Sequence, residues 1–152
     1  PQYSLVERKI ELETLPAAWA NGMAILAWSP LAAGFLTGKY TRGEAGGGQG
    51  RFARWVDDMD DRGWVTLDVV RDVAKARDVE PATVAIAWLC AKSNVIPIIG
   101  ATKPEQLDAS LAAADLRLFD DEVARLDEAG VPELGYPYDW GPPGGRPPRH
   151  LG

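Results

Sequence analysis

Two short apolar segments without polar alternation constrain the fold of this chain more than any other feature. Residues 23–28 read Met-Ala-Ile-Leu-Ala-Trp, and residues 95–99 form a second apolar run. Strands with one solvated face alternate apolar and polar side chains, whereas strands of a parallel sheet are covered on both faces by helices. Amphipathic patterns flank both segments, as is typical of a parallel α/β fold. We therefore predict two parallel strands here, each covered on both faces.

Helical patterns and turn signals divide the rest of the chain. Asn21-Gly22 is a stop signal for the first helix, and Pro81 stands at a first helical turn, where its missing N–H costs nothing. In chain order we expect a strand over 1–6, helices over 9–21, 66–77, 81–92, 104–114 and 120–129, a long loop over 41–64, and no regular element over 131–152.

Each strand leads into a segment suited to an anion. The first is followed by a loop of small residues that runs to Lys39-Tyr40, and the second passes through Gly100 into a helix. Thr102 and Glu105 have the spacing of a capping box, which predicts where that helix begins. Free N–H groups and the helix dipole favour an anion there, and Lys103 adds a positive charge. Together the two segments predict one phosphate-binding site.

Composition excludes several classes of function. The net charge of -6 argues against nucleic acid as a partner, because phosphate neutralisation needs clustered Lys and Arg. The sequence contains no apolar run of about 20 residues and opens with no leader-like segment, which predicts a cytoplasmic protein without a membrane span. Cys90 is the single cysteine, so no disulfide or cysteine-rich metal site forms within one chain. We expect Cys90 to be a buried structural thiol.

Acidic residues cluster in the predicted loop, at Asp57, Asp58, Asp60 and Asp61. A metal site would need convergent ligands, and nothing in the spacing indicates them. We interpret the cluster as solvated surface and predict no metal site. His150, the only histidine, lies in the Pro- and Gly-rich tail, where we expect no function.

Four motifs in order resemble one protein family. They are Tyr-Ser-Leu-Val-Glu-Arg at 3–8, Trp-Ser-Pro-Leu-Ala-Ala-Gly-Phe-Leu-Thr-Gly-Lys-Tyr at 28–40, Ala-Ile-Ala-Trp-Leu at 85–89 and Ile-Pro-Ile-Ile-Gly-Ala-Thr-Lys-Pro-Glu-Gln-Leu at 96–107. From residue 1 to about 140 the chain resembles the C-terminal half of an aldo-keto reductase. The branch is the one that includes Tas-type bacterial enzymes and the beta subunits of voltage-gated potassium channels.

The resemblance implies a fold and a cofactor. The fold would be the C-terminal half of a (β/α)₈ TIM barrel, with about strands 6 to 8 and their helices, and the cofactor would be NADP(H) bound across the C-terminal rim. Trp28 would stack on the nicotinamide ring, although Trp28 taken alone also suits a core position. The pyrophosphate would be held by Ser29, Pro30, Leu31 and Gly34, with charge from Lys39 and Arg51. The 2′-phosphate end would be held by Gly100, Thr102, Lys103 and Gln106.

The departures from the family matter as well. Its catalytic Asp, Tyr, Lys and His belong to the N-terminal half of the barrel, so we assign no catalytic residue to this chain. At the adenine end Ala109-Ser110 stand where the family commonly has Glu-Asn. Residues 1–140 would form the partial, NADP-binding barrel, and we expect residues 141–152 to be a disordered tail outside the family pattern.

These observations predict the cofactor-binding part of an NADP-dependent aldo-keto reductase, which reduces a carbonyl to an alcohol. The complete enzyme would act on a small-molecule carbonyl substrate. We expect the chain to be a fragment of a longer enzyme or to pair with another polypeptide, because an unclosed barrel leaves an open edge and an exposed inner face. The alternative is a non-catalytic binding or regulatory half-barrel that acts through a partner chain, either a complementary half-barrel or a second copy.

Overall fold

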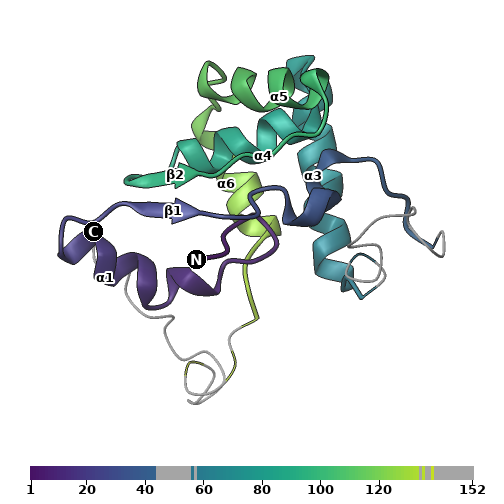
Figure 1. Cartoon of the computed structure of the whole chain (residues 1–152). Coiled ribbons are helices and arrows are strands. Elements are labelled where there is room, and N and C mark those ends of the chain that lie inside the picture. Colours follow the sequence, from purple (N-terminus) through teal and green to yellow (C-terminus); the bar gives the residue numbers. More distant parts are fainter. Residues whose placement is uncertain (44–55, 57, 134, 136–137, 139–152) are drawn as a thin grey trace.

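The computed structural model of this protein describes residues 1–43, 56, 58–133, 135 and 138. Two strands, β1 (Ile25–Ala27) and β2 (Val95–Pro97), pair in parallel, with Ile25 opposite Val95 (Figure 1). The N-terminal segment extends the sheet on the other side of β1 through a parallel bridge between Gln2 and Trp28. Both predicted parallel strands are confirmed, although each is shorter than the apolar run that contains it.

Helices connect these parallel segments. They are η1 (Lys9–Glu11), α1 (Thr14–Ala20), η2 (Ala32–Thr37), α3 (Asp61–Arg77), α4 (Pro81–Cys90), α5 (Pro104–Leu111), η3 (Ala112–Ala114) and α6 (Asp120–Ala129). The predicted helix over 9–21 is divided into η1 and α1. Asn21 and Gly22 end it as expected, with Gly22 at a φ of 64°.

Helix α3 begins earlier than the sequence predicted. The side chain of Asp60 accepts a hydrogen bond of 2.7 Å from the Gly63 N–H, which is the bond of an N-cap residue. The predicted loop over 41–64 is therefore wrong at its end, where residues 61–64 are helical. Of the acidic cluster, Asp60 and Asp61 stand at the start of this helix, and both are exposed, as the interpretation as solvated surface predicts. Asp61 pairs with Arg42.

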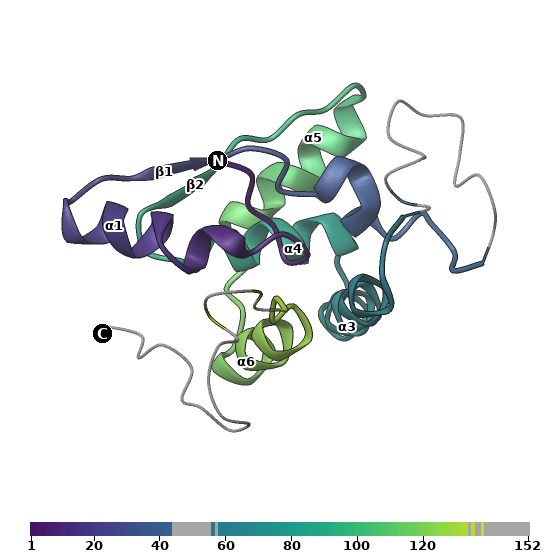
Figure 2. The same ribbon diagram turned by 90° about the horizontal axis from the view of Figure 1, so that it is seen from below.

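Helix α4 lies at the centre of the core. Every residue from 82 to 89 is buried, and the helix contacts α3, α5, η2, η3 and β2. Seen from below, α4 lies between the strands and the adjacent pair of α3 and α6 (Figure 2). The indole of Trp88, which is fully buried, meets the ring of Tyr3 edge to face at 5.4 Å. A helix that is apolar on all sides is expected in such a position.

One face of the sheet is open, contrary to prediction. Ile25, Ala27 and Val95 are buried against the helices, whereas the alternate side chains are about half exposed. On the open face lie Leu26 (57% exposed), Trp28 (51%) and Ile96 (52%). Successive side chains of a strand point to opposite faces, and the described helices cover only one of them. The core position considered for Trp28 is thereby excluded in this structure.

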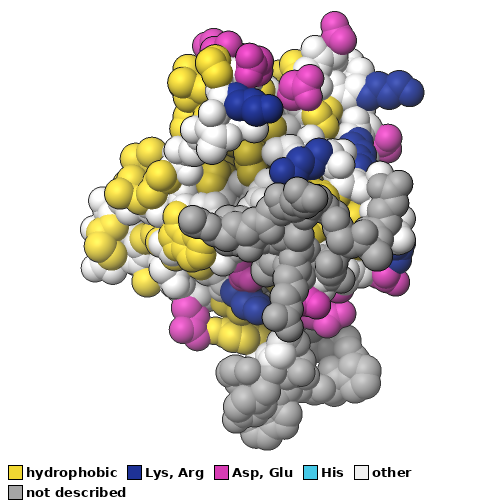
Figure 3. All heavy atoms as spheres, turned by 45° about the vertical axis from the view of Figure 1, so that its right-hand side comes forward, with side chains coloured by type: hydrophobic (Ala, Val, Ile, Leu, Met, Phe, Trp, Pro, Cys, Tyr) yellow, Lys and Arg dark blue, Asp and Glu magenta, His cyan; other side chains and the backbone are white. Residues whose placement is uncertain are grey.

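Other surface positions differ from expectation too. Cys90 is exposed at the C-terminal end of α4, so its predicted burial is wrong, although partial burial raises the pKa of its thiol. Hydrophobic side chains lie at the surface in several places among acidic and basic ones (Figure 3). In the described residues there is no helix long and apolar enough to cross a membrane. Some positions named in the sequence analysis lie outside the described part of the chain; they are Arg51, Asp57, His150 and the tail over 141–152.

Candidate cofactor-binding cavity

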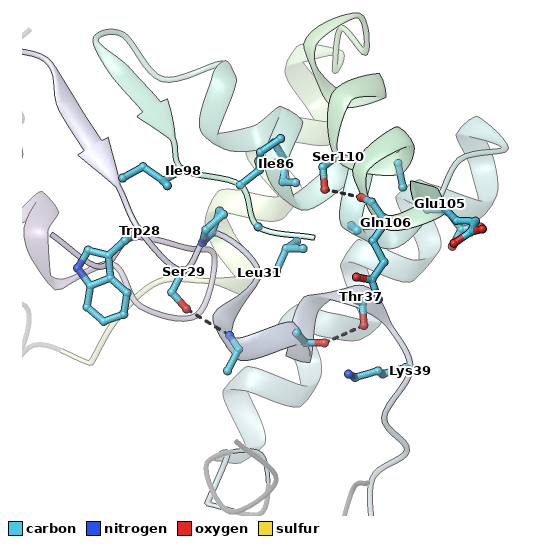
Figure 4. A pocket seen from close by; sticks show the side chains of 18 residues that line it. Trp28, Ser29, Leu31, Thr37, Lys39, Ile86, Ile98, Glu105, Gln106 and Ser110 are labelled. Carbon is cyan, nitrogen blue, oxygen red and sulfur yellow. Dashed lines mark hydrogen bonds between the residues drawn. The ribbon is translucent and has the colours of Figure 1, made fainter. Parts of the chain in front are cut away.

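A cavity of about 700 Å³ opens just beyond the carboxyl ends of β1 and β2, between η2 and α5 (Figure 4). Its size is within the range of small-molecule and cofactor sites. Figure 4 shows Trp28 at one end and Glu105 and Gln106 at the other. The lining residues are Trp28, Ser29, Pro30, Leu31, Ala33, Gly34, Thr37, Lys39, Glu80, Ala82, Ile86, Ile98, Ile99, Gly100, Glu105, Gln106, Ala109 and Ser110.

Most of the residues predicted to bind a cofactor meet at this cavity. Those that line it are Trp28, Ser29, Pro30, Leu31, Gly34, Lys39, Gly100 and Gln106. Thr102 and Lys103 are exposed at the start of α5 and do not line it. Arg51 lies outside the described residues, so its predicted place at the site stays a prediction. Two segments far apart in the sequence thus form one cavity, as their motifs predicted.

The loop after β1 has an unusual backbone. Ser29, Ala33 and Gly34 have φ values of 56°, 56° and 89°, in the left-handed region that non-glycine residues rarely adopt. Side chains stabilise this conformation. The Ser29 Oγ accepts a hydrogen bond of 3.2 Å from the Ala33 N–H, and the Thr37 Oγ1 donates one of 2.7 Å to the Gly34 carbonyl. Strained backbone of this kind is enriched at ligand sites.

Lys39 brings a positive charge to the cavity. Its Nζ lies 4.9 Å from the centre of the Tyr40 ring. A Cβ on Gly34 would come within 3.4 Å of the same nitrogen, so the lysine packs against the bare backbone of the loop. Among the described residues no carboxylate forms an ion pair with Lys39.

The start of α5 differs from the predicted capping box. The helix begins at Pro104, so Lys103 is the N-cap residue, and no side chain caps it. Thr102 lies one position too early and donates from its N–H and its Oγ1 to the Oε1 of Gln106, at 3.0 and 3.2 Å. Glu105 is left to line the cavity. The fixed φ of Pro104 suits the first helical position and moves the start past Thr102.

The other residues that line the cavity were not among those predicted from the sequence. Residues missed there are Ala33, Thr37, Glu80, Ala82, Ile86, Ile98, Ile99 and Glu105. Ile98 and Ile99 immediately precede Gly100 and could have been included on that ground. Glu80, Ala82 and Ile86 belong to α4 or its N-cap, which the sequence marked only as a packing helix. Ala109 and Ser110, noted as departures from the family, line the cavity as well.

Among the lining residues the ionisable ones are Lys39, Glu80 and Glu105. The Ser110 hydroxyl donates 2.8 Å to the Gln106 carbonyl of its own helix, so its proton is already used. Ile86 and Ile98 form an apolar wall. A lysine, a loop of small residues and a flat indole are groups that suit a ligand with phosphates and an aromatic ring.

Comparisons with known proteins agree with the geometry. The model of the Aldo/keto reductase family matches residues 1–131. The chain belongs to this family. It is 37% identical over 126 residues to the uncharacterized oxidoreductase YrpG of Bacillus subtilis, covering 82% of this chain and 37% of that protein. A probable voltage-gated potassium channel subunit beta of rice is 36% identical over 140 residues, covering 86% and 42%.

An NADH-specific methylglyoxal reductase of Escherichia coli is 34% identical over 136 residues, covering 84% of this chain and 40% of that protein. A solved structure of a thermostable aldo-keto reductase, Tm1743, superposes with a TM-score of 0.61 at 24% identity, covering 84% of this chain and 38% of that one. The fold is accordingly part of a TIM barrel. The chain spans between 37% and 42% of the length of these relatives.

The cavity lies where a barrel of this family would have its ligand site. Barrel enzymes build their sites at the carboxyl ends of the strands, and phosphate sites commonly form from the last loops. Here η2 follows β1 and α5 follows β2 at that same end of the sheet (Figure 1). The open face with Leu26 and Ile96 is the face that a closed barrel turns inward.

Proposed function

We propose that this chain supplies the cofactor-binding part of an NADP(H)-dependent aldo-keto reductase. The observation that carries the proposal is the cavity between η2 and α5, in which the residues of both predicted motifs meet at the carboxyl ends of parallel strands. A bound nicotinamide dinucleotide would supply hydride for the interconversion of a carbonyl and an alcohol.

The donor set of the cavity fits the phosphates of such a cofactor. Among the described residues, the backbone N–H groups of Ser29 and Leu31 have no hydrogen-bond acceptor. Lys39 adds a positive charge that pairs with no described carboxylate. Gly34 and Gly100 let backbone approach a ligand closely, with no atom within 4 Å of a Cβ built on Gly100. We assign the pyrophosphate to the loop with Ser29, Pro30, Leu31 and Gly34.

Trp28 suits the ring of the nicotinamide. Its side chain is 51% exposed at one end of the cavity, on the sheet face that no described element covers. An indole face in this setting can stack on a flat ring. Ile98 lies on the same side and would extend the apolar surface on which the ring rests.

Among the described lining residues the ionisable groups are Lys39, Glu80 and Glu105, and Figure 4 shows Lys39 and Glu105 at the end of the cavity opposite Trp28. We therefore propose that the proton donor comes from the remainder of a complete barrel, and that this chain by itself is inactive. With NADPH and 4-nitrobenzaldehyde the purified chain should consume no nicotinamide above a protein-free control. Turnover that survives repurification would contradict this assignment.

We assign the preference for NADP over NAD to residues at the start of α5. Lys103 is exposed there, and Gln106 lines the cavity one turn further on. A lysine at this place can pair with a 2′-phosphate, which NAD lacks. The relative from Escherichia coli is named NADH-specific, so the preference requires its own test.

That test is a titration of NADP⁺ and NAD⁺ followed by tryptophan fluorescence. Lys103→Glu should weaken NADP⁺ by about tenfold or more and NAD⁺ much less, because like charges would meet only at the 2′-phosphate. Lys75→Glu, at an exposed lysine of α3 outside the cavity, is the matched charge reversal and should change neither affinity. Equal losses for both nucleotides in Lys103→Glu would remove the 2′-phosphate from this helix start.

A second function is favoured by the open sheet face. Leu26, Ile96 and Ile98 are each at least half exposed there, and such a patch marks an interaction surface. A non-catalytic half-barrel would use this face to hold a partner, either a complementary half-barrel or a second copy. Mixing the chain with the N-terminal part of a related barrel distinguishes the two functions. NADPH-dependent turnover by the complex supports the enzyme, whereas a stable complex without turnover supports the binding role.

A further inference from the structure

Arg71 of α3 binds the backbone on both sides of Lys39. Its Nη2 donates to the Gly38 carbonyl at 2.9 Å and also to the Tyr40 carbonyl. Its Nη1 donates to Asp68 Oδ1 at 3.1 Å, which holds the guanidinium on its own helix. Arg71 does not line the cavity. An arginine that bridges the two carbonyls flanking one lysine fixes that lysine's backbone without touching a ligand.

The same short segment is held by two further contacts. Gly38 has a φ of 80°, and a Cβ there would lie 3.0 Å from Pro81 Cγ at the start of α4, so any side chain at this position would be strained. Tyr40 is 7% exposed, and its ring stacks on Phe35 at 6.5 Å with an angle of 19°. Lys39 is thus the exposed residue between two anchored neighbours.

The direction of the Lys39 side chain follows from these anchors. Its ammonium lies over the Tyr40 ring and beside Gly34, at the cavity wall. A lysine stem has many rotamers, and a charge held at one place binds a phosphate better than a charge that samples many places. If Arg71 released the carbonyls of Gly38 and Tyr40, both the ring and the ammonium would lose their fixed position.

We propose that Arg71 is a positioning residue for Lys39, which acts through the backbone of residues 38–40 to set the affinity of the cavity for phosphate groups. This inference rests on the proposed function, because it takes Lys39 as a phosphate contact. Because the loss of Arg71 would release Lys39 from its fixed position, we expect a fivefold to tenfold loss of affinity, as an order of magnitude.

A double-mutant cycle in the full chain tests the proposal, with NADP⁺ as the probe and tryptophan fluorescence as the readout. Arg71→Ala should weaken binding about fivefold to tenfold, and Lys39→Ala at least as much. The double variant should bind no more weakly than Lys39→Ala alone, since Arg71 acts only through Lys39. A merely structural arginine would instead give additive losses, and that result would overturn the proposal.

Arg62→Ala is the matched control. Arg62 lies on the same helix and donates through Nη1 to the Val131 carbonyl at 2.9 Å, away from the cavity. Its loss should leave the affinity for NADP⁺ unchanged. If Arg71→Ala does not fold, Arg71→Lys replaces it, because lysine keeps the charge but has no guanidinium fork to bridge two carbonyls.

Hydrogen exchange supplies a readout that needs no ligand. The Gly38 amide, whose N–H donates to the Phe35 carbonyl at 3.3 Å, should exchange faster in Arg71→Ala than in Arg62→Ala, and equal rates would overturn the proposal directly. If the wild-type chain binds no nucleotide, the proposed function fails and this inference fails with it. If the wild-type chain and Arg71→Ala bind equally well while Lys39→Ala does not, only this inference fails.

Discussion

Charged side chains gather in two regions of this molecule, the cavity between η2 and α5 and a cluster that joins the N-terminal segment to α6. We call the second region the α6 clamp, and its members are Tyr3, Arg8, Glu11, Trp88, Lys92 and Asp127. In the cavity, Lys39, Glu80 and Glu105 form no ion pair with any described residue. In the clamp every charged group has a partner.

The clamp is built around one buried arginine. Arg8 is 8% exposed, and its Nε and Nη2 bind the two carboxylate oxygens of Glu11 at 2.8 and 2.9 Å. Its Nη1 donates to the Asp127 carbonyl at 2.7 Å. The Tyr3 hydroxyl donates to Glu11 at 2.6 Å. This network satisfies the donors of a group that is costly to bury alone.

Asp127 closes the clamp on the other side. Its Oδ1 accepts from the Trp88 Nε1 at 2.9 Å and from the Lys92 Nζ at 2.8 Å. The comparison teaches that charges paired within the described fold and charges without a described partner serve different ends. In the clamp the charged groups hydrogen-bond to one another and hold α6 in place. In the cavity the charged side chains make no such bonds to described residues, and a ligand could hydrogen-bond to them.

Breaking the clamp at its centre should have the largest effect on stability. Arg8→Ala removes the cation that binds both carboxylate oxygens of Glu11 and the Asp127 carbonyl. We expect a loss of about 3 kcal/mol in the free energy of unfolding, because this charge network is mostly buried. Urea unfolding followed by circular dichroism measures it. Arg125→Ala is the control, because Arg125 meets Asp72 at 3.9 Å with both side chains exposed, and should cost less than about 1 kcal/mol. Equal losses would mean that the clamp does not stabilise the fold.

A methyl group added at Gly130 should also push α6 away from the N-terminal segment, the two parts that the clamp joins. A Cβ on Gly130, directly after α6, would lie 2.4 Å from the Leu5 carbonyl oxygen, which is backbone and cannot move aside cheaply. Gly130→Ala should cost about 1–3 kcal/mol by urea unfolding. Gly135→Ala, where no atom lies within 4 Å, is the matched control and should be nearly neutral. A neutral Gly130→Ala would show that the approach of α6 to the N-terminal segment is loose.

The sequence predicted the cavity better than the clamp, and the reason is physical. The motifs at 28–40 and 96–107 are local, and each places its residues at one strand end, where the parallel topology brings them together. The bond from Arg8 to Asp127 joins residues that are 119 positions apart. No periodicity or turn signal reports such a pairing, so the clamp could not be predicted from one sequence.

The errors made from the sequence are instructive in the same way. Thr102 and Glu105 have the spacing of a capping box, but Pro104 shifts the helix start and gives both residues other partners. Apolar strands without alternation predicted two covered faces, whereas the described elements cover one. The spacing within each motif thus predicts which of its residues lie near each other. Whether a strand face is buried depends on other elements of the barrel, which the motif does not report.

The clamp should also respond to alkaline pH. Burial, together with the neighbouring Glu11 carboxylate, raises the pKa of the Tyr3 hydroxyl above its ordinary value. The unfolded chain ionises this tyrosine near pH 10 and the folded chain does not, so its contribution is present below about pH 10 and is lost as the pH rises further.

Tyr3→Phe should therefore cost about 1 kcal/mol at pH 7 and show a smaller fall in stability above pH 10 than the wild-type chain. Unfolding free energies between pH 7 and 11 measure both. Tyr138→Phe is the less buried counterpart, because Tyr138 also donates to a glutamate, Glu13, but lies nearer to water, which screens the interaction. Parallel pH profiles for Tyr3→Phe and the wild-type chain would contradict the assigned role of Tyr3.

The smallest effect on stability is expected at the cavity, and it separates the two regions most sharply. A Cβ on Gly100 meets no atom within 4 Å, and its φ lies outside the left-handed region, so Gly100→Ala should change the free energy of unfolding by less than about 0.5 kcal/mol. The same methyl group would stand in the cavity where we assign the phosphate end of the cofactor, so NADP⁺ affinity should fall while stability does not. Fluorescence titration and urea unfolding of the one variant measure both quantities. A variant that binds NADP⁺ like the wild-type chain would show that the backbone at Gly100 does not approach the ligand, and the phosphate site would then have to be sought along η2 alone.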